Sequence, residues 1–128
     1  MSQGIINALY KMMQDGLPLS GRLVTDHTFH DAVSAAADGT TLTVAGNKTL
    51  TVEIYGTSTS RNVAFMGVGP SGTARSIMGV KLSDLSTGTS TTGTGELWQF
   101  DVAGLTSVIM DLTAVSGGNV SVKGKVVA

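Results

Sequence analysis

Short runs of alternating apolar and polar residues follow one another through most of the chain, and turn residues separate nearly all of them. Alternation with a period of two residues is typical of a strand with one buried and one exposed face. The polar positions in these runs are mostly Thr and Ser, and the gaps are rich in Gly. The pattern therefore predicts a compact all-β domain. The runs cover residues 42–44, 50–55, 62–66, 97–102, 108–112 and 120–127.

The alternation also predicts which side chains form the core. It is clearest in residues 50–55, where every second residue, beginning with Leu50, is apolar and branched. Residues 97–102 supply a second inward face, on which Trp98 is the largest side chain. The side chains expected to be largely buried are Val52, Ile54, Phe65, Trp98, Phe100, Val108 and Val122.

The connections favour a particular class of β fold. Residues 69–72, Gly-Pro-Ser-Gly, predict a tight turn because Pro presets φ and Gly accepts a positive φ. Residues 74–80 are expected to return as one strand, residues 85–95 to form a long exposed loop, and residues 116–119 to join the last two strands as a hairpin. About seven or eight strands with short connections favour an antiparallel β-sandwich, of jelly-roll or immunoglobulin-like kind, over a barrel.

Residues 17–40 show the weakest pattern. Residues 17–24 are expected to form an extended arm that leads into a first strand, and residues 25–33 to form a second strand. Residues 34–39 fit either a helical turn or a loop, since they end in the turn signal Asp-Gly.

The first 16 residues predict a short amphipathic helix, which leaves residues 17–128 for the β-sandwich domain. Ser2 suits the N-cap, Gly16 suits the left-handed residue after the last turn, and Pro18 prevents continuation. A helix of about a dozen residues is marginal in water unless its apolar side packs on a partner. Its apolar residues recur at helical spacing and form a stripe of Ile5, Ile6, Leu9, Met12 and Met13.

Two partners are open for this stripe: one end of the β-domain itself, or a second copy or larger assembly. A β-sandwich covers its core between its own two sheets and does not need the stripe for closure. We therefore expect the stripe to be an oligomer or docking interface. The expected product is a homo-oligomer, with a trimer as the first expectation and a dimer as the second.

Composition excludes several classes of function. Charged residues make up 13% of the 128 residues and the formal net charge is −1, so the chain lacks the basic surface of nucleic-acid-binding proteins. The absence of Cys excludes disulfides and thiol catalysis. No run reaches the ~18 apolar residues of a membrane-spanning helix, and the N-terminal residues do not resemble a signal peptide. We expect no nucleic acid, no membrane insertion, and synthesis in a cytoplasm.

One segment combines residue types that bind metals. His27 and His30 lie between Asp26 and Asp31. Zinc takes three or four ligands at tetrahedral angles, whereas two residues three apart on a strand point to opposite faces. We therefore expect polar surface or subunit contacts here, with no metal and no other cofactor.

Catalytic motifs are not found in the sequence. There is no Gly-x-Ser-x-Gly elbow, and the Gly-x-Gly segments at 67–69 and 93–95 lack the following helix and the Lys-Ser/Thr pair of phosphate-binding loops. The acidic residues are expected to solvate strand faces and cap turns rather than to face one another across a cleft. They are Glu53, Asp84, Glu96, Asp101 and Asp111. We expect no catalytic site and no enzymatic activity.

Sugar binding is the alternative function that the sequence leaves open. It requires an exposed aromatic ring beside polar side chains, and Tyr55 lies on the strand face opposite the expected core. Aromatic residues are only 5% of the chain, which is low for a carbohydrate-binding module. Tyr55 is the candidate ligand contact of a module that attaches to a host surface glycan.

Four segments, residues 50–65, 79–85, 96–105 and 114–127, resemble small β-sandwich virion proteins of tailed phages and prophages of Bacillus-like hosts. The resemblance covers roughly the last two thirds of the chain and contains no catalytic motif. Residues 69–75 depart from it, because Gly-Pro-Ser-Gly replaces the usual Asp-Gly turn and aromatic residue. The resemblance implies a non-enzymatic virion structural protein, either a head decoration protein or a tail or fibre component. Such a protein would contact other virion proteins and would be located in the virion.

Overall fold

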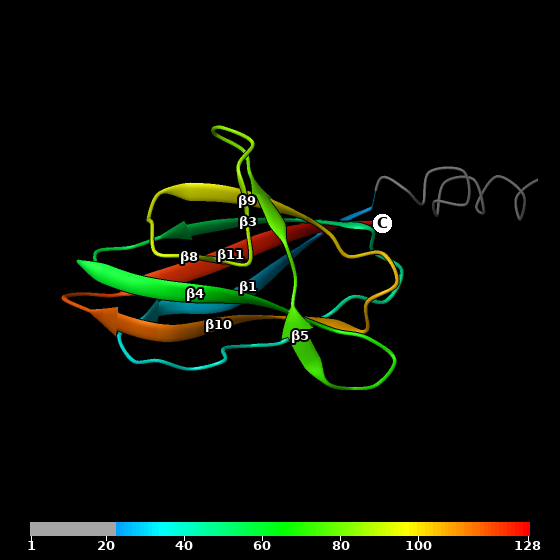
Figure 1. Ribbon diagram of the computed structural model, residues 1–128, viewed down its shortest axis with the longest axis horizontal. Helices are drawn as coiled ribbons and strands as arrows, with labels where there is room; N and C mark the ends of the chain where they lie inside the picture. Colours follow the sequence, from blue (N-terminus) through cyan, green and yellow to red (C-terminus); the bar gives the residue numbers. More distant parts are fainter. Residues whose placement is uncertain (1–22) are drawn as a thin grey trace, which may run out of the picture.

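In the computed structural model of the protein, residues 23–128 are described. They form an antiparallel sandwich of two β-sheets, six- and five-stranded, and contain no helix (Figure 1). Within this part of the chain no helix is long and apolar enough to cross a membrane. The predicted all-β sandwich is confirmed, whereas the predicted helix over residues 1–16 lies outside the described residues.

The first sheet contains four long strands and two short ones. Each strand pairs antiparallel with its neighbours. The order across the sheet is β1 (Val24–Val33), β11 (Val120–Val127), β3 (Thr49–Tyr55), β9 (Glu96–Asp101), β6 (Gly79–Lys81) and β7 (Thr87–Gly88).

The second sheet is built on two long strands that pair along most of their length. Its order is β2 (Leu42–Thr43), β10 (Ser107–Ser116), β4 (Ser60–Val68) and β5 (Ala74–Ser76), and β8 (Ser90–Thr91) also pairs with β4. Five strands of the two sheets are only two or three residues long. Strands this short show no alternation, so the sequence predicts fewer strands than the fold contains.

The core lies between the two sheets. The rings of Trp98 and Phe100 in β9 each lie 4.9 Å from the ring of Phe65 in β4, which joins the sheets by aromatic contacts. All of the side chains that the alternation assigns to the core are buried, so that prediction is confirmed. They are Val52, Ile54, Phe65, Trp98, Phe100, Val108 and Val122.

The strand predicted over residues 25–33 is confirmed, whereas residues 17–22 of the predicted arm lie outside the described residues. Residues 24–33 form the single strand β1, which lies at the edge of its sheet. Its pairing with β11 is irregular between Thr28 and His30 and again before Val33. A bulge interrupts the two-residue period, and this explains why the sequence shows no clean alternation here. Residues 34–39 form a loop, and a single bridge joins Ala37 to Leu112.

Two predictions, the hairpin at residues 116–119 and the single strand over residues 74–80, are wrong for the same reason. In both segments the chain crosses from one sheet to the other. Residues 116–119 do not close a hairpin, because β10 lies in the second sheet and β11 in the first. Gly117 and Gly118 have φ of 72° and 148°, which lets the chain cross between the sheets. Residues 74–80 likewise divide into β5 and β6, which lie in different sheets. The predicted turn at residues 69–72 is confirmed by the bond from Gly72 N–H to Gly69 O.

Candidate functional site

A hollow of about 590 Å³ lies on the outer face of the six-stranded sheet. It extends over β1, β11, β3 and β9, whose outward side chains stand next to one another by register: Lys125 lies opposite Asp26, and Lys123 lies opposite Glu53. Val24, Leu97 and Val127 add apolar surface to the lining. We call this feature the outer-face hollow. Its volume lies in the range of ligand sites in proteins.

Charges of both signs line the outer-face hollow. The Lys125 ammonium lies 3.5 Å from an oxygen of Asp26, and the Lys123 ammonium lies 3.7 Å from an oxygen of Asp31. A hydrogen bond with Tyr55, together with Asp31, raises the pKa of Lys123 above its ordinary value. Exposed ion pairs contribute little to stability, so these two pairs are not expected to hold the sheet together.

A smaller hollow of about 330 Å³ adjoins the first and shares Glu53 and Leu97 with it. Lys81 and Glu96 lie on its lining. The two hollows together extend across the outer face from β1 to the end of β6.

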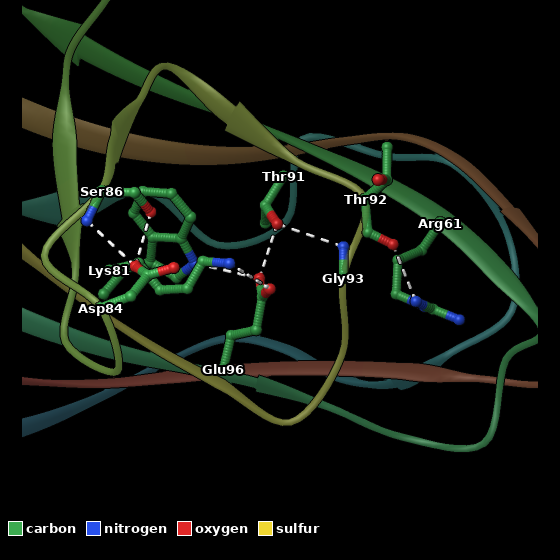
Figure 2. A network of polar contacts seen from close by, with 9 residues as sticks. Arg61, Lys81, Asp84, Ser86, Thr91, Thr92, Gly93 and Glu96 are labelled. Atoms are coloured by element: carbon green, nitrogen blue, oxygen red, sulfur yellow. Dashed lines mark hydrogen bonds and ion pairs between the residues drawn. The ribbon is translucent and has the colours of Figure 1, made fainter.

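Glu96 lies at the centre of a network that fixes the loop before β9 (Figure 2). Its Oε1 accepts hydrogen bonds from Thr91 Oγ1 at 2.6 Å and from Trp98 Nε1 at 3.1 Å, and its Oε2 lies 3.3 Å from Lys81 Nζ. Burial raises the pKa of Glu96, but the hydrogen bonds from Thr91 and Trp98 and the Lys81 ammonium outweigh it, so the pKa lies below the ordinary value. The carboxylate is therefore held in its charged form and engaged by neighbouring residues.

A second anchor holds the other part of the same loop. Arg61 is 9% exposed, and its guanidinium donates to Ser58 Oγ, Ser58 O and Thr92 O at 2.7, 2.7 and 2.8 Å. Figure 2 shows the bond to Thr92 O. Thr91 is also buried. Most of residues 85–95 are exposed, as predicted for this loop. The segment also contains the short strands β7 and β8, and polar contacts of Arg61 and Glu96 hold it against the sandwich.

Of the other acidic residues, Asp84 and Asp101 cap turns, and Asp111 lies beside a second carboxyl group. Asp84 accepts from Ser86 N–H and Oγ, and Asp101 accepts from Ala103 N–H, so both cap turns as predicted. Burial, followed by the neighbouring carboxyl of Asp38, raises the pKa of Asp111 above its ordinary value.

The two histidines bind main-chain carbonyls. The Nε2 atom of His27 lies 3.0 Å from Thr40 O, and that of His30 lies 2.6 Å from Met110 O. A carbonyl only accepts, so each Nε2 carries a hydrogen. The bulge buries both Phe29 and His30, and the simple alternation expected here is not kept. Among residues 23–128, no three His, Asp or Glu side chains gather as a metal site.

Tyr55 lies on the outward face of β3, as predicted, and is half-buried beside Lys123. It is not part of the lining of the outer-face hollow, so the residue chosen from the sequence and the hollow are separate features of one face. The stripe residues Ile5, Ile6, Leu9, Met12 and Met13 lie outside the described residues.

Sequence reasoning missed the role of Glu96 and Arg61. A signal was present for Glu96: a buried Trp needs an acceptor for its indole N–H, and Glu96 precedes Trp98 by two residues, on the same strand face. Arg61 gives no such signal, because its acceptors are provided by the folded loops.

The described residues form a small antiparallel β-sandwich with a hollow on the outer face of one sheet. The chain belongs to the XepA family, which matches residues 23–126.

Relatives in Bacillus subtilis support this assignment. The chain is 38% identical to YqxG over 122 residues and 39% identical to the phage-like element PBSX protein XepA over 112 residues, which cover 92% and 88% of this chain. It spans only 41% and 40% of the length of these two relatives. The SPbeta prophage-derived protein YomS is 39% identical over 104 residues, which are 81% of this chain and 87% of YomS.

Two crystal structures have the same fold. YomS superposes with a TM-score of 0.80 over 83% of this chain and 94% of the YomS chain. The PBSX exported protein XepA superposes with a TM-score of 0.84 over 86% of this chain and 39% of the XepA chain. Both are 39% identical in sequence. The predicted resemblance to prophage proteins of a Bacillus host is thereby confirmed, and the match extends over more of the chain than predicted.

Proposed function

We propose that this protein is a non-enzymatic structural component of a phage or prophage particle. It decorates the head or extends the tail or a fibre through protein–protein contacts, and it is located in the virion. The observation that carries the proposal is the homology to YomS, which comes from the SPbeta prophage and matches this sandwich over nearly its whole length.

The engagement of the polar side chains supports a non-enzymatic role. Glu96, Arg61 and His30 each bind groups that hold the loops or the two sheets together. A catalytic acid, base or nucleophile instead needs access to a substrate atom. In this proposal the protein forms a homo-oligomer, a trimer before a dimer, through the stripe of Ile5, Ile6, Leu9, Met12 and Met13, and it contacts other virion proteins.

Mass spectrometry of purified particles tests the virion role. Particles induced from the host and purified by density gradient should contain the protein in amounts comparable with known structural subunits. A host cytoplasmic protein that is absent from the particles serves as the control for carry-over. Recovery of the protein only in the lysate, with none in mature particles, would refute the proposal.

A second candidate function, attachment to a host surface glycan, is favoured by the position of Tyr55. Its ring faces outward beside Lys123, and Glu53 lies on the same strand face. Aromatic rings with neighbouring hydrogen-bonding groups are suited to sugars. A glycan array tests it: specific binding that Tyr55→Ala abolishes and Tyr55→Phe retains would favour this candidate over the structural role.

A further inference from the structure

Residues 34–41 connect the two sheets along one edge of the sandwich, and we call them the edge strap. They follow β1 at the edge of the first sheet and lead into β2 at the edge of the second. In Figure 1 they form the cyan trace beside β10. Ala37 exchanges two main-chain hydrogen bonds of 3.0 Å with Leu112 of β10, and Thr40 N–H donates to Phe29 O of β1 at 2.9 Å. The main chain of the edge strap is therefore tied to a strand of each sheet.

The tie to β10 places two carboxyl groups opposite each other. In an antiparallel arrangement, a pair that exchanges two hydrogen bonds is followed by a pair without them, whose Cα atoms are only about 4.5 Å apart. Ala37 and Leu112 form the bonded pair, so the next pair consists of Asp38 and Asp111. Like charges in directly opposite positions are destabilising. Repulsion between these two carboxylates therefore acts on the strap itself.

The titration of Asp111 agrees with this placement. Burial, followed by the neighbouring Asp38 carboxyl, raises the pKa of Asp111 above its ordinary value of 3.8. The second sheet supplies no charge that opposes this within the described residues. Asp111 lies opposite Ala64 of β4, β2 contains only Leu42 and Thr43, and the guanidinium of Arg61 is occupied by the loops that it holds.

From the first sheet, His30 is the group that the strap covers. It is 3% exposed, and its Nε2 donates to Met110 O at 2.6 Å, across the gap between the sheets. Gly39 of the strap lies so close to the imidazole that an added Cβ would overlap with it. A positive charge on His30 favours the charged form of Asp111. Closure of the strap therefore keeps this imidazole out of water.

The remaining ionisable side chains of β1 are bound elsewhere. Asp26 and Asp31 pair with Lys125 and Lys123, respectively. The Nε2 atom of His27 lies 3.0 Å from a main-chain oxygen of the strap. The opposed carboxyl groups of the strap and β10 are thus the like-charged pair that bears directly on strap closure.

We propose that the edge strap is a pH-sensitive switch: in acid, one proton shared by Asp38 and Asp111 holds the strap on β10, and towards neutral pH the two carboxylates repel and the strap opens more often. The sign follows from the raised pKa of Asp111. The stabilising contribution is fully present below the ordinary value of 3.8 and is lost as the pH rises through the folded-state pKa. Opening exposes His30 and the edge of β10. The switch is a property of the sandwich and does not depend on the proposed virion role.

Amide hydrogen exchange of the full-length protein, followed by NMR, tests the switch. Rates are expressed as protection factors, which removes the intrinsic dependence of exchange on pH. The readouts are the amides of Ala37, Thr40 and Leu112, and the reference is Val102 N–H, which donates to Lys48 O at 2.9 Å, away from the strap. Relative to Val102, the three protection factors should fall by about two- to five-fold between about pH 3 and pH 7, the size expected for one cross-strand charge pair. No fall, or an equal fall at Val102, would overturn the proposal.

Substitutions at the exposed Asp38 assign the effect to the carboxyl pair. Asp38→Asn should abolish the fall, and Asp38→Lys should reverse it, because the ammonium attracts Asp111 once that carboxyl is charged. Glu53→Gln, at an exposed carboxylate on the first sheet, should leave the fall unchanged. Histidines change their charge between about pH 5 and 8, and both remain in Asp38→Asn. A fall that persists in that variant would therefore belong to the histidines and would overturn the assignment to Asp38 and Asp111.

Discussion

Single residues matter most in this protein where a side chain holds main-chain groups of another segment. Arg61 is the clearest case, since its three hydrogen bonds join β4 to the residues before it and to the loop that contains Thr92. The planar guanidinium can make these bonds at once, whereas a Lys ammonium on a flexible stem cannot. Loss of the bonds leaves carbonyls without donors near the buried side chain.

We expect Arg61→Lys to lower the free energy of unfolding by about 1–3 kcal/mol, the cost of leaving buried polar groups unpaired. Urea unfolding followed by Trp98 fluorescence measures it. Arg75→Lys on the exposed strand β5 is the matched control and should change stability by less than about 0.5 kcal/mol. Equal effects of the two substitutions would contradict the anchoring role of Arg61.

Glu96 predicts a dependence of stability on pH. Its folded-state pKa lies below the ordinary value of 4.5, so its contribution is fully present above that pH and is lost as the pH falls through the folded-state pKa. Asp111 has the opposite sign, because its raised pKa costs stability while it is charged and this cost disappears on acidification.

Glu96→Gln should therefore destabilise the protein by about 1 kcal/mol at pH 7, since charge-assisted hydrogen bonds become neutral ones. It should also flatten the loss of stability with acidification below the ordinary pKa of 4.5. Urea unfolding at several pH values measures both effects. Glu53→Gln, an exposed carboxylate on the same sheet, is the control. An unchanged pH profile in Glu96→Gln would contradict the assignment.

The sequence predicts the buried apolar residues well and the polar anchors poorly, and the reason is physical. Alternation records which face of a strand is buried, so Val52, Ile54 and Trp98 are predictable from their spacing alone. The partners of Arg61 are a hydroxyl and carbonyls of loops, which every sequence possesses. Only the tertiary fold determines which of them come within reach.

At the scale of elements, connections decide how well the fold is predicted. Turn residues show where a strand ends, but a hairpin within one sheet and a crossing between two sheets use the same residue types. Residues 116–119 read as a hairpin for this reason, although they cross between the sheets. The short strands β7 and β8 are likewise formed by pairing and loop anchoring, without an alternating pattern of their own.

The loop before β9 gives the prediction at this scale. A Cβ at residue 93 would overlap with Oε2 of Glu96, so Gly93→Ala should displace the loop or the carboxylate. We expect a loss of about 1–3 kcal/mol, typical of overpacking. Gly46→Ala is the control, because its added Cβ would meet no atom within 4 Å. Thermal unfolding by circular dichroism measures both, and equal stability of the two variants would count against the network.

At the scale of the whole molecule, residues 23–128 form a core that is closed between their own two sheets. Its buried apolar residues run from Phe29 to Val126. The stability of the sandwich is therefore expected to be independent of residues 1–16.

Deletion of residues 1–16 should leave a β-dominated circular dichroism spectrum and cooperative unfolding, with weaker self-association in light scattering. Each apolar side chain removed from a contact could cost about 1.5–3 kcal/mol of association free energy. A truncated protein that is unfolded, while the full-length protein is a monomer, would show that residues 1–16 belong to the core of their own domain.

The hydrogen bond between Leu23 and Ala128 bears on how this domain can be joined to other domains during evolution. It places the entry and the exit of the sandwich side by side. A unit whose two ends meet can be spliced into a longer polypeptide, or exist without one, and keep its interior unchanged. The family shows both arrangements: YomS is matched over 94% of its chain, and XepA over 39%. The sandwich is thus suited to gene fusion as an independent domain. Additional domains are expected to join it at the edge where Leu23 and Ala128 lie side by side.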